Sequence, residues 1–220
     1  MTMVQNRAHK TEGEADEKRL SPASTKIVHA AELEFAEKGF DGAGMKALAQ
    51  RAGGSQSLLH YHFRSKDQLY TAVIRERSKL INAERLARLH AVDLDQPEAL
   101  ANIFAAFFLP ALGPAGGGRA YARIFAGLIA GNERDQALVR EFYDPTAQKF
   151  IDAIALTLPG SDRAAAAQIY QFALGVLASV ISRDGRADRL GGSKIASLDN
   201  ALLVDKLTRF AVGGAKALTN

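Results

Sequence analysis

Apolar residues recur along most of this 220-residue chain at spacings of three and four, which is the period of an α-helix. Ile27, Ala31 and Phe35 form the first such stripe, and it follows Ser21–Pro22, a pair typical of a helix N-terminus. Gly39 is suited to the left-handed residue that ends a helix. No stretch shows the strict alternation of a convincing β-strand. The pattern therefore predicts an all-α protein.

Two further short helices and a long one follow in the sequence. We expect a helix from Met45 to about residue 52, stopped by Gly53–Gly54, and then a helix of barely two turns that Ser55 caps. A long helix begins near Lys66 and reaches about residue 89. Two short helices joined by a glycine turn, packed on the first helix, are the pattern of a helix-turn-helix unit.

The remaining apolar periods predict a larger helical region. Helices are expected at about 97–110, 119–130, 135–158, 162–183 and 200–216, with loops at 113–118 and 185–193. The polar first 20 residues lack an apolar period and are interpreted as a flexible tail. The predicted organisation is a tail at 1–20, a helix-turn-helix DNA-binding domain at 21–68, and a helical ligand-binding and dimerisation domain at 69–220.

Composition narrows the class of protein. The chain has no cysteine, which excludes disulfides and thiolate metal sites and fits a cytoplasmic location. Its N-terminus has no signal-peptide pattern, and its uninterrupted apolar runs are shorter than a bilayer requires, so no membrane contact is expected. The net charge is +4, and residues 71–90 hold five basic and two acidic residues. This excess indicates either a patch for nucleic acid or a solvated helix face.

The segment SQSLLHYHFRSKDQLY, residues 55–70, holds most of the candidate chemistry. His60 and His62 are two positions apart, so on a helix they point in nearly opposite directions and cannot share a metal ion. A flat face on a two-turn helix offers no closed pocket for a catalytic base. We therefore expect no metal, no cofactor and no enzymatic activity. A helix does fit the DNA major groove, where Gln56 can pair with adenine.

The sequence resembles the TetR/AcrR family of bacterial one-component regulators over residues 27–73. The resemblance lies in AEKGF, LAQRAG and SKDQLY, which occur in the family's order and spacing. It implies an all-α homodimer with an N-terminal DNA reader and a ligand-binding C-terminal region. Carried over by position, the base-facing residues are Gln56, Ser57, Leu58 and Tyr61. The phosphate-facing residues are Lys46, His60, His62 and Lys66.

Several positions depart from the family pattern. Ala43 and Gly44 stand where a Thr/Ser pair usually caps the second helix and contacts phosphate. Gly54 replaces a valine that packs the turn, and Leu58 stands at a common threonine. His60 replaces a tyrosine that usually bonds phosphate. These departures leave the predicted fold intact and bear on the strength of DNA binding.

Aromatic and basic residues of the larger region are candidates for an effector pocket, with ordinary core packing as the alternative. The basic residues would meet an acidic head group such as a fatty acyl carboxylate. The candidates are His90, Phe104, Phe107, Phe108, Tyr121, Arg123, Phe125, Arg140, Tyr143 and Phe172.

The helix expected at 162–183 carries two apolar stripes with small residues between them, which predicts either a subunit interface or a central core helix. The interface candidates are Ile169, Phe172, Gly175, Val176, Ala178, Ser179 and Val180. The partners expected overall are an operator in double-stranded DNA, a second copy of the chain and a small-molecule effector. The main hypothesis is a ligand-responsive regulator, most simply a repressor of a palindromic operator that a mainly apolar effector releases. The alternative is a helical DNA-binding or interaction protein that responds to no effector.

Overall fold

The computed structural model describes residues 20–182, 185–192 and 199–219, and every regular element in these ranges is a helix. The predicted tail at 1–20 lies outside the described residues except for residue 20. The all-α prediction is confirmed. The elements are α1 (Pro22–Gly42), α2 (Met45–Arg51), α3 (Gln56–His62), α4 (Lys66–His90), α5 (Ala99–Leu112), η1 (Pro114–Gly116), α6 (Gly118–Ile129), α7 (Glu133–Phe142), α8 (Asp144–Thr157), α9 (Arg163–Ser182), α10 (Arg186–Gly191) and α11 (Asn200–Ala217).

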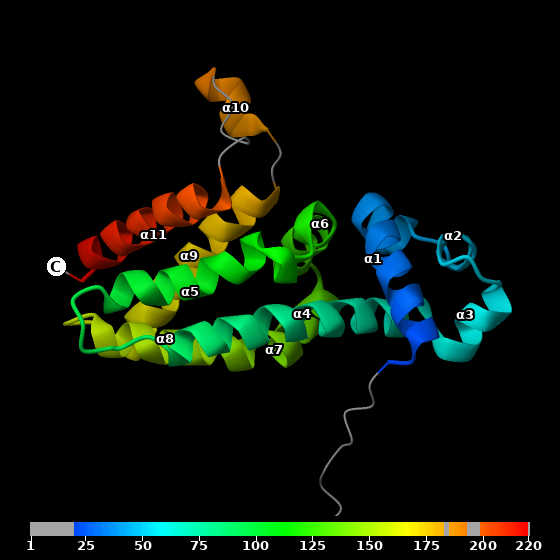
Figure 1. Cartoon of the computed structure of the whole chain (residues 1–220), viewed down its shortest axis with the longest axis horizontal. Coiled ribbons are helices and arrows are strands. Elements are labelled where there is room, and N and C mark those ends of the chain that lie inside the picture. Colours follow the sequence, from blue (N-terminus) through cyan, green and yellow to red (C-terminus); the bar gives the residue numbers. More distant parts are fainter. Residues whose placement is uncertain (1–19, 183–184, 193–198, 220) are drawn as a thin grey trace, which may run out of the picture.

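Helices α1, α2 and α3 form a head at one end of the molecule (Figure 1). The predicted caps are present: Ser21 accepts a hydrogen bond from the backbone N–H of Ser24, and Ser55 accepts one from Leu58. Gly39 has φ 69°, so the helical path of α1 is interrupted where the sequence predicted its end. Apolar side chains from all three helices fill the core of the head, including Phe35, Leu48 and Leu59.

Helix α4 connects the head to the body, which consists of α5–α11 together with η1. It runs as one continuous helix from beside α3 and lies along the body (Figure 1). Ser65 caps its first turn by accepting from the N–H of Gln68. The domain limit predicted at residue 68 therefore falls inside the first turn of α4. A single rigid element thus belongs to both parts of the molecule.

Three features of the body differ from the sequence prediction. The helix expected at 135–158 is two helices, α7 and α8, because Pro145 has no N–H to donate and its ring crowds the preceding turn. Helix α5 continues two residues past Pro110, so this proline lies inside its last turn. The loop expected at 185–193 contains the short helix α10, which projects from the body in Figure 1.

Helix α9 has one face in the core of the body and one face outside. Ile169 is buried within the chain itself, which corrects its assignment to a subunit interface, whereas Phe172 is 53% exposed and Gly175 and Ser179 are also exposed. By length and composition alone α9 is apolar enough to cross a membrane, contrary to the expectation from its uninterrupted apolar run. Its buried face packs into the body as a core helix does.

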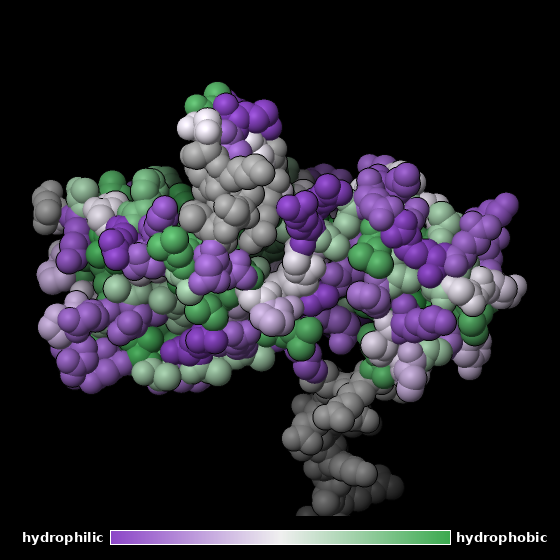
Figure 2. Space-filling view, turned by 45° about the horizontal axis from the view of Figure 1, so that its top comes forward, coloured by the Kyte–Doolittle hydropathy of each residue, from purple (hydrophilic) through white to green (hydrophobic). Residues whose placement is uncertain are grey.

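Hydrophobic residues also reach the outer surface of the body. Figure 2 shows them side by side with hydrophilic residues on the face turned to the viewer. On α11, which packs beside α9, Phe210 is 68% exposed and Leu202 is 44% exposed. Single exposed apolar residues are common on proteins, but two neighbouring helices that both expose phenylalanine indicate a surface for association.

Candidate nucleic-acid interface and effector site

Helix α3 presents a polar face to solvent at the tip of the head. Leu59 and, just beyond the helix, Phe63 are buried against α1 and α2, and this packing turns the opposite face outward. The four base-facing candidates, Gln56, Ser57, Leu58 and Tyr61, are all exposed, and Tyr61 is 83% exposed. The structure therefore brings these four side chains together on one accessible surface.

The four phosphate-facing candidates are placed differently. Lys46 and His60 are exposed. The Nδ1 atom of His62 lies 3.1 Å from the hydroxyl of Ser24 on α1, which fixes the ring and leaves Nε2 for another contact. Lys66 is half-buried, and its ammonium donates to the backbone oxygen of Asp41 at 3.4 Å. Two of the four candidates are thus already held by the head, and the other two are unobstructed.

The positions that depart from the family pattern also have structural consequences. Gly44 precedes α2 without any side-chain cap, as its lack of a side chain dictates. Gly54 borders a groove of about 220 Å³ between α1, α2 and α3. A Cβ atom at Gly54 would lie 3.1 Å from Leu58 Cδ2, so the leucine side chain stands close to the turn.

At least three of the five basic residues in 71–90 make contacts within the protein. Arg77 is 15% exposed and is ion-paired with Glu32 on α1. Arg85 is 2% exposed and lies inside the body. Arg88 pairs with Glu84 one turn earlier on the same helix. The basic excess therefore serves contacts within the protein at these three positions, while Arg75 and Lys79 are exposed, which favours the solvated helix face over a nucleic-acid patch.

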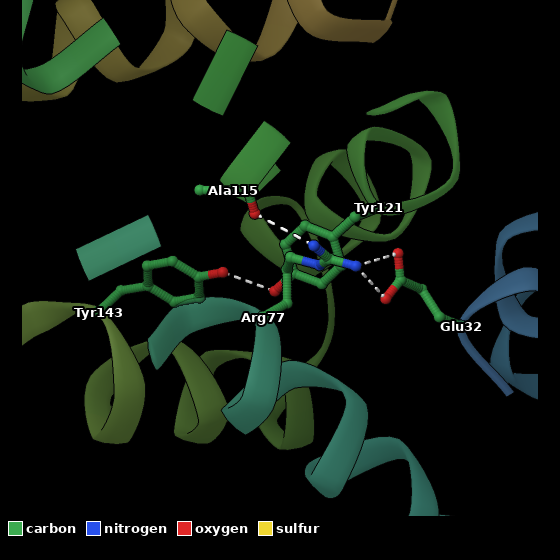
Figure 3. Close-up of polar contacts among 5 residues, drawn as sticks. All are labelled: Glu32, Arg77, Ala115, Tyr121 and Tyr143. Carbon is green, nitrogen blue, oxygen red and sulfur yellow. Dashed lines mark hydrogen bonds and ion pairs between the residues drawn. The ribbon is translucent and has the colours of Figure 1, made fainter. Parts of the chain in front are cut away.

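The Glu32–Arg77 ion pair joins the head to the body. The Nη2 atom of Arg77 lies 2.9 Å and 2.7 Å from the two carboxylate oxygens of Glu32. Its Nη1 atom donates to the backbone oxygen of Ala115 in the body at 3.2 Å (Figure 3). The guanidinium also lies 5.8 Å from the centre of the Tyr121 ring. One side chain of α4 thus holds α1 and the turn before α6 in fixed positions.

The same region contains two linked tyrosines. The hydroxyl of Tyr121 on α6 lies 2.5 Å from the hydroxyl of Tyr143, and both side chains are buried (Figure 3). Burial raises the pKa of both phenols, so both are protonated near neutral pH. The tyrosine pair continues the chain of contacts from Arg77 toward the interior of the body.

A second contact between head and body lies at the end of α1. The guanidinium of Arg134 on α7 lies 3.6 Å from the centre of the Phe40 ring and 5.2 Å from that of Tyr70. Cations over aromatic faces attract electrostatically. The head is therefore attached to α7 as well as to α4 and α6.

Two cavities lie in the body next to Tyr143. One measures about 130 Å³ and the other about 10 Å³, and both are lined by Arg85, Phe125 and Tyr143. Tyr121 lines the smaller cavity and Tyr170 the larger one. Neither reaches the roughly 300 Å³ expected of a preformed site for a drug-sized ligand.

Only part of the predicted effector pocket comes together. Tyr121, Phe125 and Tyr143 line cavities, whereas Phe104, Phe107 and Phe108 are packed in the core, where neighbouring rings fill the space. The expected pocket positions of Phe172 and the three basic residues are corrected, since all four side chains are exposed: Phe172, His90, Arg123 and Arg140. Arg140 instead pairs with Glu133 at the surface.

Arg85 was missed by the sequence reasoning, although a signal was present. It lies four residues after Ile81 and four before Leu89, and both of these are buried. Residues at this spacing share one face of a helix. A charged residue in step with an apolar stripe is unusual and indicates a functional position.

Comparisons with known proteins agree with this architecture. Residues 27–73 match a family model described as bacterial regulatory proteins, tetR family, and residues 103–214 match one described as tetracyclin repressor-like, C-terminal domain. The chain is 37% identical over 75 residues to the HTH-type transcriptional regulator UidR of Escherichia coli K12, a match that spans 33% of this chain and 38% of UidR. It is 40% identical over 62 residues to the HTH-type transcriptional activator FasR of Mycolicibacterium smegmatis, 28% of each chain.

Solved structures share the fold at low sequence identity. The fatty acid degradation regulator FadR of Bacillus halodurans superposes with a TM-score of 0.66 at 15% identity, covering 90% of this chain and 98% of FadR. FadR of Bacillus subtilis in complex with stearoyl-CoA gives 0.64 at 14% identity, covering 86% and 98%. A regulator from Saccharomonospora viridis in complex with choline gives 0.61 at 20% identity, covering 87% and 94%.

Proposed function

The chain belongs to the TetR family of DNA-binding transcriptional regulators, which are not enzymes, and we propose that it is a dimeric cytoplasmic repressor released from its operator by a small effector. In this proposal residues 21–68 bind DNA, and residues 69–220 bind the effector and the second subunit. The observation that carries it is the continuous set of contacts from the cavity-lining Tyr143 through Tyr121 and Arg77 to Glu32 in the head.

The outward face of α3 reads the operator. Gln56, Ser57, Leu58 and Tyr61 enter the major groove, where an amide side chain can make two hydrogen bonds to adenine. Lys46 and His60 contact phosphates, and Lys66 and His62 join them while still supported by Asp41 and Ser24. A two-fold dimer places two such faces about one helical turn of DNA apart, ~34–36 Å, or a multiple of it.

The exposed faces of α9 and α11 form the dimer interface. Phe172, Gly175 and Ser179 lie on α9, partly exposed Val176, Ala178 and Val180 lie beside them, and Phe210 projects from α11. Burying two phenylalanines per subunit favours association through the hydrophobic effect. The small residues allow the partner's helix to approach closely.

The effector acts through the contacts that join body and head. A molecule entering beside Tyr143 changes the Tyr121–Tyr143 hydrogen bond, and Tyr121 packs on the guanidinium that holds Glu32. A small tilt of the head alters the spacing of the two reading faces, which DNA binding requires to be fixed. An effector that prefers the tilted state ~100-fold supplies about 2.7 kcal/mol of coupling.

The related proteins support regulation by an effector, and experiment decides between repression and activation. B. subtilis FadR carries stearoyl-CoA and the S. viridis regulator carries choline in structures of this fold. FasR is an activator. We place this chain with repressors because contacts within the head itself form the reading face: Ser21 and Ser55 cap α1 and α3, and the core of the head is filled.

The test begins with selection of operator sequences from random double-stranded DNA by the full-length protein. We expect an enriched palindrome, and Gln56→Ala should lose discrimination at one base position of each half-site. The exposed Gln50→Ala on α2 is the control for a general loss of amide side chains. If no sequence is enriched, the alternative of an interaction protein is favoured. If DNA is bound and no small molecule in a metabolite extract weakens the binding, a DNA-binding protein without an effector is favoured.

A further inference from the structure

Arg85 is a buried positive charge without a negative partner. It is 2% exposed, and its Nε atom donates to the backbone oxygen of Phe107 at 3.0 Å. The guanidinium carbon lies 4.3 Å from the centre of the Phe107 ring. No ion pair with Arg85 exists among the described residues, and its two terminal amino groups donate to none of them. The charge is therefore held only by a carbonyl dipole and a ring.

Such an arrangement is unfavourable for folding. Moving an ion from water into a protein interior is costly unless an opposite charge and hydrogen bonds compensate it. By contrast, the half-buried Arg77 on the same helix forms an ion pair with Glu32. Burial lowers the pKa of Arg85, yet an arginine stays protonated near neutral pH.

The two cavities meet at this side chain. Arg85 lines both of them. Its two terminal amino groups, which donate to no described residue, are not fully enclosed by protein atoms. Tyr143 and Tyr170 border the larger cavity together with Arg85. The lining of this cavity also includes the apolar residues Ile129, Val139 and Leu174 and the polar residues Gln136 and Gln171. A guanidinium, two phenols and several apolar side chains thus line one small space.

We propose that Arg85 binds the anionic group of a small monocarboxylic acid and that this acid is the effector. The inference rests on the proposed function for the acid's regulatory role, but the binding site itself stands on the geometry. Guanidinium and carboxylate match as two parallel hydrogen bonds, and Tyr170 donates a third to the same group. The remainder of the acid lies against the apolar lining residues Ile129, Val139 and Leu174.

Size and charge narrow the class of acid. A cavity of about 150 Å³ holds benzene, so the 130 Å³ beside Arg85 suits a short-chain or single-ring acid and not a long acyl chain. The carboxylate of Asp144 also borders this cavity. Its negative charge disfavours a dicarboxylate or a phosphate, which would bring two charges to the same space.

A purely structural role for Arg85 makes a different prediction. Pro110 lies inside α5 and has no N–H to donate, and Phe107 lies one turn before it. In the alternative, the only role of the hydrogen bond from Arg85 to the Phe107 oxygen is to support this part of the helix. In that case any ligand would bind without regard to its charge. The acid site requires a strong preference for the anion, and the preference must vanish with the guanidinium.

Matched pairs of compounds test the proposal on the full-length protein without DNA. Binding of hexanoate and benzoate is measured by calorimetry beside hexanamide and benzamide, which have nearly the same shape and no charge. We expect at least one acid to bind the wild type at least 10-fold more tightly than its amide. Arg85→Met should reduce this ratio to about one, and Arg75→Met, an exposed arginine on the same helix, should leave it unchanged.

Two further measurements keep the outcomes distinct. If Arg85→Met does not fold, Arg85→Gln decides, because the amide can still donate to Phe107 while lacking the charge; a retained 10-fold preference overturns the proposal. Equal binding of acid and amide, or no binding by any of the four compounds, also overturns it. An acid that binds through Arg85 without changing operator affinity supports the site and refutes the proposed regulatory role. A neutral molecule that releases DNA equally well from the wild type and from Arg85→Met supports regulation by an effector and overturns the acid site.

Discussion

Removing Glu32 should destabilise the protein far more than removing an ion pair of similar geometry at the surface. The Glu32 and Arg77 side chains are 7% and 15% exposed, and they share two hydrogen bonds. In Glu32→Leu the guanidinium would remain mostly buried with only the Ala115 carbonyl as partner, and its Nε atom already lacks one. Breaking one side of a buried pair costs about 3–5 kcal/mol, and the residual exposure of Arg77 places the value near the lower limit.

The double variant separates the lost contact from the stranded charge. Glu32→Leu with Arg77→Met replaces the pair by apolar side chains, and such replacements are often neutral, so a total cost within about 1 kcal/mol is expected. The two single variants should therefore couple by ~2 kcal/mol or more. Glu84→Leu is the control: it breaks the pair with Arg88, whose side chains are 32% and 43% exposed, and should cost under ~1 kcal/mol.

Urea unfolding at one fixed protomer concentration measures these free energies, since the stability of a dimer depends on concentration. Additive single variants, or a Glu32→Leu cost no greater than that of Glu84→Leu, would refute the assignment of this pair as the joint between head and body. A large stability loss with unchanged effector response would limit its role to structure.

Four other predictions follow from particular residues. Gly175→Arg on the exposed face of α9 should yield a monomer in light scattering at micromolar concentration, where we expect the wild type to be a dimer. Gln56→Ala should cost ~1–3 kcal/mol in discrimination at one base, and an equal loss for every base would show that the side chain contacts only the backbone. Gly117→Ala should cost ~1–3 kcal/mol in urea unfolding, because φ is 69° and the new Cβ would lie 2.7 Å from the Arg77 guanidinium. Burial and then Asp135 raise the pKa of Tyr70 from 10.0 to about 12, so the folded state keeps a proton that the unfolded state loses. This contribution is complete below pH 10 and lost as the pH rises to about 12, by at most about 2.7 kcal/mol, and Tyr70→Phe should abolish that part of the pH dependence of unfolding.

The sequence alone determined the helical class, the helix-turn-helix head and most helix limits. Ser21, Ser55 and Ser65 cap the helices where the pattern placed them, and α3 exposes the face that the spacing of Leu59 and Phe63 predicted. These features depend on residues within one or two turns of each other, so a local pattern contains them. The break between α7 and α8 at Tyr143 also depends on a local signal, Pro145, which the prediction of one long helix overlooked.

Only the tertiary structure decided which charges lie inside and what they meet. Glu32 and Arg77 are 45 residues apart in sequence, and no helical period relates them. Arg85 stands in step with Ile81 and Leu89, but its burial and lack of a partner follow from α5, α7 and α8 packing over α4. His90, Arg123 and Arg140 are also basic residues, but their side chains are exposed. The position of a charge relative to a cavity is set by packing between distant segments, and local sequence therefore cannot specify it.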